Sequence, residues 1–286
     1  GGLAALTGGF GRGGFLGVDA FFVLSRFLIT SLLVTQRAAT GRVRLSAFWI
    51  RRARRLLPAL VVLLVVVVLV YRAESESHYL SLLRGDALAA LAYVANWRMI
   101  YRGDDYFTQT SAPSPLQHTW SLGIEEQFYL AWPLLFLSLA MFGLASRGRK
   151  ALFAAIATAG VASFVASLWL TTAAQPWAFF GLPTRIWEFA PGGSLALAMD
   201  GRTDTRTPMS AVLQWAGLAM IAFAATTYDR LTPYPGFAAL LPALGACFLL
   251  LGGNHQETSL VNRLLGVRWL TWLGRMSYAW YLWHWP

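Results

Sequence analysis

The feature that most constrains this sequence is a series of long apolar runs separated by short clusters of arginine. Hydrophobic residues make up 57% of the 286 residues and charged residues only 13%. Several of the runs approach or exceed the ~20 residues that a helix needs to cross a bilayer. This composition excludes an ordinary soluble domain. The sequence therefore predicts an all-α fold, a polytopic transmembrane bundle of about eight to ten membrane helices.

The distribution of arginine predicts which segments face the cytoplasm. The basic residues are 22 arginines and one lysine, and seven of the arginines lie between positions 37 and 55. The positive-inside rule makes that segment cytoplasmic, and it places His118 on the outer side because the next apolar run, 127–144, ends in a basic cluster. Residues 78–101 are amphipathic, and alternation predicts that they do not cross fully. The net charge of +10 is thus a topology signal, and no nucleic-acid partner is predicted.

Other apolar runs continue the alternation between the two sides of the membrane. Thirteen tryptophans and ten tyrosines are available as anchors at the two interfaces. Membrane lipids are therefore expected partners, and the pattern specifies no oligomeric state. The runs are 15–36, 56–71, 151–172, 184–199, 209–227 and 237–251, followed by a segment that starts near Trp269.

Ionisable residues inside or beside the apolar runs need partners, because a charge is costly in a bilayer. Asp19 lies near one end of the first run and Arg26 near its middle. A location at the interface accounts equally well for Asp19, and Arg26 has the alternative of extending its stem toward the headgroups. Arg185 and Glu188 are three residues apart at the end of a later run, which predicts an i,i+3 ion pair.

The stretch 115–133, PLQHTWSLGIEEQFYLAWP, brings polar residues to the start of an apolar run. If a helix begins near His118, Glu125 returns to nearly the same face seven residues later, which would allow an acid–base pair. The alternative is a helix start in which a hydroxyl side chain is the cap and Glu125 and Glu126 interact with the positive helix end. We favour a functional site, since carboxylates bordering lipid are costly.

The arginine-rich segment offers guanidinium groups to a ligand. On a helix, Arg51 lies on the same face as Arg54 or Arg55, an arrangement suited to bidentate capture of phosphates. The alternative is that the cluster sets the topology and binds lipid headgroups, as any cytoplasmic basic cluster does. No P-loop or dinucleotide-binding glycine pattern is present in the sequence.

The sequence predicts no metal. Its four histidines are scattered without ligand spacing, and the single cysteine, Cys247, excludes a cysteine-rich metal site. Cys247 is expected to be a small buried residue. His284 lies in an aromatic segment, where packing and catalysis explain it equally well.

Five stretches together resemble the acyltransferase 3 family of integral-membrane O-acyltransferases. The resemblance covers essentially the whole chain, so residues 1–286 are expected to form a single transmembrane acyltransferase domain. It implies transfer of an acetyl or other short acyl group from acetyl-CoA or another acyl-CoA in the cytoplasm to a hydroxyl of a cell-envelope glycan or glycolipid at the outer face. It also implies the bacterial cytoplasmic (inner or plasma) membrane as location. The stretches are GGFLGVDAFFVLSRFLIT, FWIRRARRLLPAL, PSPLQHTWSLGIEEQFYLAWP, PTRIWEFAPGGSLAL and GRMSYAWYLWHWP.

The resemblance also implies site residues. Arg51 and Arg54 resemble the family's paired-arginine motif, which would face the phosphates of the donor, and Asp19 matches the aspartate of the family's G-V-D segment. The two adjacent glutamates are similar to the family's acidic pair, with a histidine ahead of them as in the family. The expected catalytic residues are therefore His118, Glu125, Glu126 and Asp19, and the expected donor-binding residues are Arg51, Arg52, Arg54 and Arg55.

Two departures from the family pattern affect these expectations. The family has an arginine and, some ten residues later, a histidine regarded as the acyl-transfer base in a helix ahead of the G-V-D segment, but here no histidine precedes His78. The segment 1–7 resembles the start of that helix joined abruptly to Gly8, so the first helix and the C-terminal end are expected to be incomplete. His118 with Glu125 is then the best remaining acid–base pair.

The second departure is Arg26, which stands where the family has a glycine that permits close helix approach. Either departure is also what an inactive or fragmentary chain would show. The alternative function is a transporter or flippase for an anionic or lipid-linked substrate that uses the intramembrane charges as its pathway. A transporter would need no acyl-CoA, whereas the enzyme would release free coenzyme A.

Overall fold

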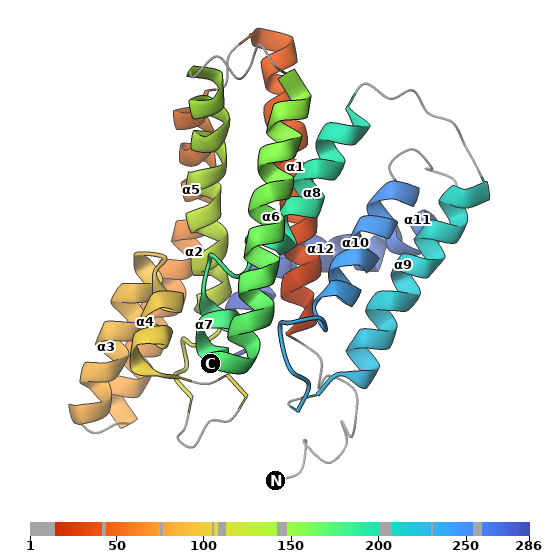
Figure 1. The fold of residues 1–286 in the computed structure, drawn as a ribbon. Coiled ribbons are helices and arrows are strands. Elements are labelled where there is room, and N and C mark those ends of the chain that lie inside the picture. Colours follow the sequence, from red (N-terminus) through yellow and green to blue (C-terminus); the bar gives the residue numbers. More distant parts are fainter. Residues whose placement is uncertain are drawn as a thin grey trace.

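The structure is a computed structural model, and it describes residues 15–41, 44–74, 77–104, 106–107, 113–141, 148–200, 208–229, 231–253 and 259–286. The described residues contain helices and no strand, which confirms the predicted all-α class (Figure 1). The helices are α1 (Leu16–Thr40), α2 (Leu45–Glu74), α3 (Ser77–Leu91), α4 (Ala95–Arg102), α5 (Thr119–Met141), α6 (Gly148–Ala173), α7 (Gln175–Phe180), α8 (Ile186–Met199), α9 (Pro208–Thr227), α10 (Leu240–Gly253), α11 (Leu260–Leu265) and α12 (Arg268–Trp283).

Four of the described helices are long and apolar enough to cross a membrane, and α10 is a shorter apolar helix. The protein is therefore an integral membrane protein. The total of eight to ten membrane helices stays a prediction. The four spans are Leu16–Thr40, Leu45–Ala73, Lys150–Ala173 and Met209–Thr227.

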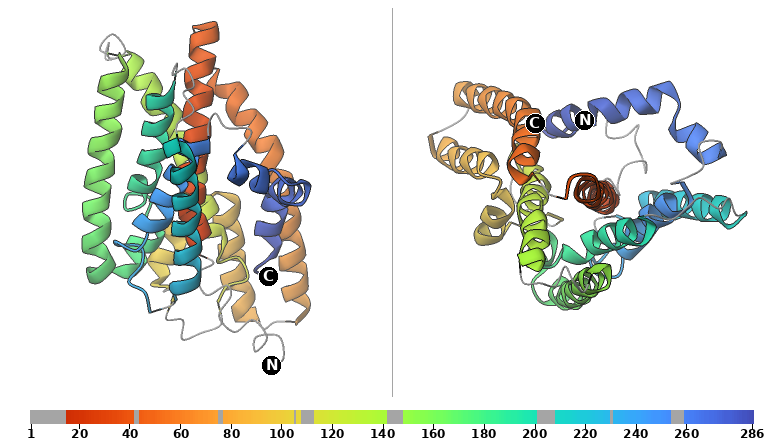
Figure 2. Two further views of the ribbon diagram at one scale, coloured as in Figure 1. Left: turned by 90° about the vertical axis from the view of Figure 1, so that its right-hand side faces the viewer. Right: turned by 90° about the horizontal axis from the view of Figure 1, so that it is seen from above.

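Helix α1 occupies the interior of the bundle. Seen from above, α1 appears end-on with the other helices around it (Figure 2). Its buried side chains are both apolar and polar, because Asp19, Ser25 and Arg26 are enclosed together with Phe22 and Leu33. In Figure 1, α2, α3 and α4 lie to one side of α1, and α9 and α10 lie to the other. A central helix that carries charged residues must meet its partners on several neighbouring helices.

Helices α1 and α8 cross closely because α8 supplies glycine at the contact. A Cβ atom on Gly192 would lie 2.1 Å from the carbonyl oxygen of Val23 in α1. One on Gly193 would lie 3.5 Å from the Thr30 hydroxyl of α1 and 2.8 Å from a ring carbon of Trp132 in α5. The family's glycine in α1 is replaced by Arg26, yet the close approach is kept from the α8 side. Small residues at such contacts let two membrane helices pack backbone to backbone.

Three predicted boundaries differ from the structure. The second span was expected to open at residue 56, but α2 starts at Leu45 and continues through the arginine-rich segment with Pro58 inside it. The segment 78–101 is divided into α3 and α4 by a break at which Tyr93 has a φ of 56°. The apolar span expected to open at residue 127 is part of α5, which begins earlier, at Thr119, next to the helix start considered near His118. Expectations for residues 1–14, Arg42, Arg202, Arg206 and His255 lie outside the described residues.

Candidate functional site

The position of the acidic pair on α5 tests the helix-start interpretation of the 115–133 stretch. Because α5 begins at Thr119, no acidic residue lies in its first turn, and Glu125 and Glu126 are in the second turn. The Thr119 hydroxyl donates a hydrogen bond to the carbonyl of Leu116 at 2.6 Å, which leaves it pointing back along the chain. The helix-start alternative is therefore wrong, since the favourable effect of a helix end falls off within the first turn.

The partner of the acidic pair is Arg52 on α2. Its Nε donates to Glu126 Oε1 at 2.7 Å, and its Nη2 lies 3.1 Å from Glu125 Oε1 and 2.5 Å from Glu126 Oε1. The same guanidinium stacks over the Tyr129 ring, 3.0 Å from the ring centroid. One cation therefore joins two carboxylates and an aromatic face, and it connects the arginine-rich part of α2 to α5.

The arginine cluster is thereby divided into two parts. Arg51, Arg54 and Arg55 are exposed, whereas Arg52 turns inward toward α5. The sequence predicted all four as donor-binding residues. In the structure, only the three exposed guanidinium groups lie open to a ligand, because the fourth is already engaged by carboxylates.

Hydrogen bonds with α1, α2 and the break between α3 and α4 fix α5 around this ion pair. The Ser25 hydroxyl of α1 lies 2.8 Å from the Tyr129 hydroxyl and donates to Glu125 Oε1 at 3.4 Å. Trp49 of α2 donates from its indole to the Tyr129 carbonyl at 3.1 Å. Gln127 donates to the carbonyl of Tyr93, at the α3–α4 break, at 2.7 Å. The i+4 spacing of Glu125 and Tyr129 was the sequence signal for this face of α5.

Arg26 lies beside this cluster and is completely buried, with 0% of its surface exposed. Its guanidinium carbon sits over the rings of Phe128, Tyr129 and Phe189 at 4.1, 4.3 and 4.7 Å from their centroids. Its Nη2 donates to the Glu125 carbonyl at 3.5 Å, and its Nε and Nη1 have no hydrogen-bond partner. The expectation that Arg26 reaches the headgroups is wrong, because aromatic faces hold it inside the bundle.

A second buried cluster joins the start of α1 to the start of α8. Arg185 Nη1 donates to Asp19 Oδ1 at 2.8 Å and to Glu188 Oε1 at 2.6 Å, which confirms the predicted i,i+3 pair and adds Asp19 to it. Tyr234 donates from its hydroxyl to Asp19 Oδ2. Asp19 is 0% exposed and is held by Arg185, so contact with interfacial water does not account for it. The sequence signal was that each charge in an apolar run needs a partner.

His118 belongs to a third group, together with the end of α12. Its ring lies 5.4 Å from the rings of both Tyr281 and His284, measured between centroids. The Tyr281 hydroxyl donates to the His118 carbonyl, and His284 Nδ1 lies 2.6 Å from the Tyr281 carbonyl oxygen. Neither ring nitrogen of His118 has a hydrogen-bond partner. Burial, followed by the nearby His284, lowers the pKa of His118 below its usual range, which keeps the imidazole neutral.

The predicted pairing of His118 with Glu125 is not formed. Both side chains are described, and Glu125 accepts from Arg52 while the imidazole of His118 stays unpaired. The reason is geometric, because His118 lies in the turn before α5 rather than on the helix, and Arg52 of α2 occupies both glutamates. Among the described residues, no group of three or more His, Cys, Asp or Glu side chains could hold a metal. Cys247 is buried, as expected.

Comparison with known proteins identifies the family. The pattern described as "Acyltransferase domain" matches residues 3–286 of this chain. The chain belongs to this family. It is the acyltransferase 3 family that the five sequence stretches resemble, so that resemblance is confirmed. No solved structure matches the chain.

Among curated proteins, several relatives in this acyltransferase family cover almost all of the chain. Peptidoglycan O-acetyltransferase OatA of Listeria monocytogenes is 37% identical over 96% of this chain and 45% of its own length. Putative peptidoglycan O-acetyltransferase YrhL of Bacillus subtilis is 33% identical over 96% and 44%. O-acetyltransferase OatA of Staphylococcus aureus is 34% identical over 96% and 46%. The chain thus spans about half the length of the curated relatives that it matches.

Proposed function

We propose that this protein is an O-acetyltransferase of the bacterial cytoplasmic membrane. It takes an acetyl or other short acyl group from acyl-CoA on the cytoplasmic side and delivers it to a hydroxyl of a cell-envelope glycan on the outer side. The observation that carries the proposal is the match of the acyltransferase domain family to residues 3–286, together with relatives named as peptidoglycan O-acetyltransferases. Peptidoglycan is accordingly the first acceptor to test.

The reaction needs a base for the acceptor and a site for the donor. The acceptor oxygen attacks the thioester carbonyl, the carbon–sulfur bond breaks, coenzyme A leaves as the thiol, and the proton of the hydroxyl passes to a base. His118 is our candidate base, because neither of its ring nitrogens has a hydrogen-bond partner. The lowered pKa of His118 keeps the imidazole in the form that can accept a proton, but it also weakens the imidazole as a base. Burial to 5% exposure also keeps bulk water from competing with the acceptor hydroxyl.

The donor site is proposed at the start of α2. Arg51, Arg54 and Arg55 are exposed there on a helix that also carries Arg52, and guanidinium groups suit the phosphates of coenzyme A. The ion pair of Arg52 with Glu126 connects this surface to α5, which begins one residue after His118. Glu125 and Glu126 act in this proposal on the side of the donor, by holding Arg52 in one orientation.

Asp19 has a positioning role in the proposal. Its two carboxylate oxygens are taken by Arg185 and Tyr234, which leaves it no open position toward a substrate. The cluster ties α1 to α8 at the point where each helix begins. It therefore fixes α1, the helix that carries Ser25 and Arg26 into the site.

The test of this function is release of coenzyme A from acetyl-CoA by the purified chain in proteoliposomes. Release should require soluble peptidoglycan fragments on the side of the vesicle membrane opposite acetyl-CoA. These fragments should gain an ester-linked acetyl group. His118→Gln should lower turnover by roughly 100-fold or more, the contribution typical of a general base, with acetyl-CoA binding retained. Movement of an anionic or lipid-linked solute without use of acetyl-CoA would instead support the transporter alternative.

Replacing Arg51 and Arg54 together by alanine is expected to weaken acetyl-CoA binding by roughly 10-fold or more. The loss of about 1.4 kcal/mol or more reflects two guanidinium–phosphate contacts at a solvated surface. Lysine at both positions should restore part of the affinity, since it keeps the positive charge but cannot donate two parallel hydrogen bonds to one phosphate as a guanidinium does. The measurement is a titration of acetyl-CoA, with Arg263→Ala plus Arg268→Ala as a control of equal charge loss. If Arg51→Ala plus Arg54→Ala bound acetyl-CoA as tightly as wild type, the proposed donor site would be contradicted.

A further inference from the structure

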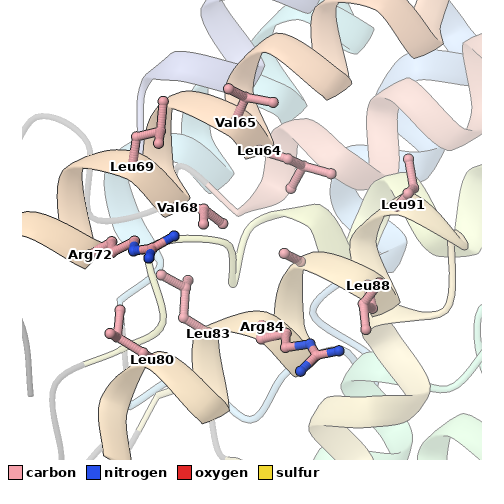
Figure 3. Close-up of a pocket in the computed structure, with 11 residues that line it drawn as sticks. Leu64, Val65, Val68, Leu69, Arg72, Leu80, Leu83, Arg84, Leu88 and Leu91 are labelled. Carbon is pink, nitrogen blue, oxygen red and sulfur yellow. The ribbon is translucent and has the colours of Figure 1, made fainter. Parts of the chain in front are cut away.

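A groove between α2 and α3 has no role in the proposed reaction. The two helices lie side by side as a hairpin (Figure 1), and an open groove with a volume of about 460 Å³ lies between them. Its wall is aliphatic, with Leu64 and Leu83 buried at the bottom and Leu69 and Leu88 at the sides. Arg72 of α2 and Arg84 of α3 are the polar residues of the lining, and their guanidinium groups lie among these leucines and valines (Figure 3). The volume falls in the range of about 300–1,000 Å³ that is typical of small-molecule sites.

The two arginines of the groove have no acidic partner among the described side chains. Asp86 follows Arg84 closely on α3, but its carboxylate is already taken by two arginines of α4. Arg98 Nε donates to Asp86 Oδ1 at 2.5 Å. Arg102 Nη1 donates to Asp86 Oδ1 at 3.0 Å and to Asp86 Oδ2 at 3.1 Å. The positive charge of Arg72 and Arg84 is therefore available to an anion from outside the protein.

The position of the groove along α2 indicates its depth in the membrane. A rise of about 1.5 Å per residue puts Arg72 about 30 Å along α2 from Arg52. That distance equals the thickness of the hydrocarbon core, about 30 Å. Arg72, in the last turn of α2, thus reaches the headgroup layer opposite the arginine-rich end, and the aliphatic part of the groove lies on the hydrocarbon side of it.

We propose that this groove binds an anionic phospholipid of the leaflet opposite the arginine-rich end of α2. One acyl chain lies along the aliphatic wall, and the phosphate lies between Arg72 and Arg84. Basic pockets between membrane helices bind acidic headgroups in this way. A glycan does not fit, because the wall offers neither aromatic rings nor hydrogen-bonding side chains other than the arginines. A zwitterionic lipid fits less well, because its headgroup brings a positive charge of its own toward two cations.

The experiment compares phosphatidylglycerol with phosphatidylcholine as the bound lipid. The purified chain is held in phosphatidylcholine nanodiscs, phosphatidylglycerol is added in steps, and the melting temperature is followed. A ligand that binds the folded state raises this temperature by mass action. We expect a rise of several degrees with phosphatidylglycerol that levels off at saturation, and no comparable rise with additional phosphatidylcholine. Glycerol 3-phosphate, which has the headgroup phosphate without acyl chains, should not reproduce the rise.

Two variants test separately how the positive charge and the open space of the groove contribute to lipid binding. Arg72→Gln plus Arg84→Gln should lose at least half of the rise, and Ala87→Phe, which fills the groove and keeps both arginines, should lose most of it. Arg263→Gln plus Arg268→Gln, with the same loss of charge elsewhere, should keep the full rise.

Photocrosslinking gives a second readout that does not depend on melting. Phosphatidylglycerol with a photoreactive acyl chain should label peptides of α2 and α3 in wild type, and at least fivefold less in Ala87→Phe. An equal rise for both lipids, or a full rise and full labelling in both groove variants, would overturn the proposal.

Discussion

Replacing Glu126 by glutamine is expected to lower the rate of acyl transfer by roughly 100-fold or more while acetyl-CoA still binds. Glutamine keeps the shape of the side chain but removes the charge that holds Arg52, whose Nε donates to Glu126 Oε1 at 2.7 Å. A charged partner makes this hydrogen bond about twice as strong as a neutral one. The freed guanidinium would then lose its fixed orientation between the donor surface and α5. Single-turnover rates and donor affinities of the purified variants separate the two effects.

Three further variants show whether the loss belongs to the reaction or to the fold. Glu125→Gln should lower the rate in the same direction, because Glu125 accepts from the same Arg52 group. Trp49→Phe removes a neighbouring hydrogen bond to Tyr129 without touching a charge, so its rate should stay near wild type. Combining Arg52→Gln with Glu125→Gln and Glu126→Gln leaves neither carboxylate without its cation, so it should recover stability lost in Arg52→Gln but not the rate. A near-normal rate in both glutamate variants would give the acidic pair a purely structural role.

The acidic pair also shows how far sequence reasoning reaches. Helical spacing correctly placed Glu125 and Tyr129 on one face, because side chains four residues apart on a helix are neighbours. The same spacing failed for His118, since it assumed that the helix had already begun there. It also could not find Arg52, which is 74 positions away from Glu126 in the chain. Spacing within one helix carries no information about which other helix packs against it.

Buried charges gave a different kind of signal. The cost of a charge in a bilayer implied that Asp19 and Arg26 needed partners, and Asp19 has one in Arg185, 166 positions away. The rule predicted that each buried charge needs a partner, but it did not predict which residue that partner is. Arg26 has no carboxylate partner, and aromatic rings from α5 and α8 surround it instead. A rule based on ion pairs could not predict that solution, because an aromatic face is attractive to a cation without any charge.

Replacing Arg185 by methionine is expected to cause the largest loss of stability among single substitutions in the bundle. The change leaves Asp19 and Glu188 buried without a cation, since both accept from Arg185 Nη1. It also removes the hydrogen bond from Arg185 Nε to the Phe179 carbonyl at 3.0 Å. Removing one partner of a buried ion pair costs about 3–5 kcal/mol. Tyr234→Phe, which removes one hydrogen bond to Asp19, should cost about 1–3 kcal/mol. Unfolding in mixed micelles with increasing denaturant measures both.

A triple variant tests whether uncompensated charge is the cause. Arg185→Met combined with Asp19→Asn and Glu188→Gln removes more native contacts than Arg185→Met alone, yet it leaves no unpaired charge. It should therefore be the more stable of the two, because uncompensated buried charge costs more than the lost contacts. The opposite order would mean that packing of the Arg185 stem, not the ion pair, holds α1 to α8.

Arg26→Met provides the matched comparison for Arg185→Met, since both arginines are buried to 1% exposure or less. Among the described residues, Arg26 has no carboxylate within ion-pair distance, and Glu125 and Glu126 keep Arg52 as their cation when Arg26 is removed. The substitution eliminates two buried nitrogens that lack hydrogen bonds, each worth about 1–3 kcal/mol when unsatisfied. It forfeits a cation–aromatic attraction of about 2 kcal/mol. The two terms oppose each other, so Arg26→Met should unfold near the wild-type midpoint or above it. A loss as large as that of Arg185→Met would mean that Arg26 stabilises the bundle through an interaction other than its aromatic contacts.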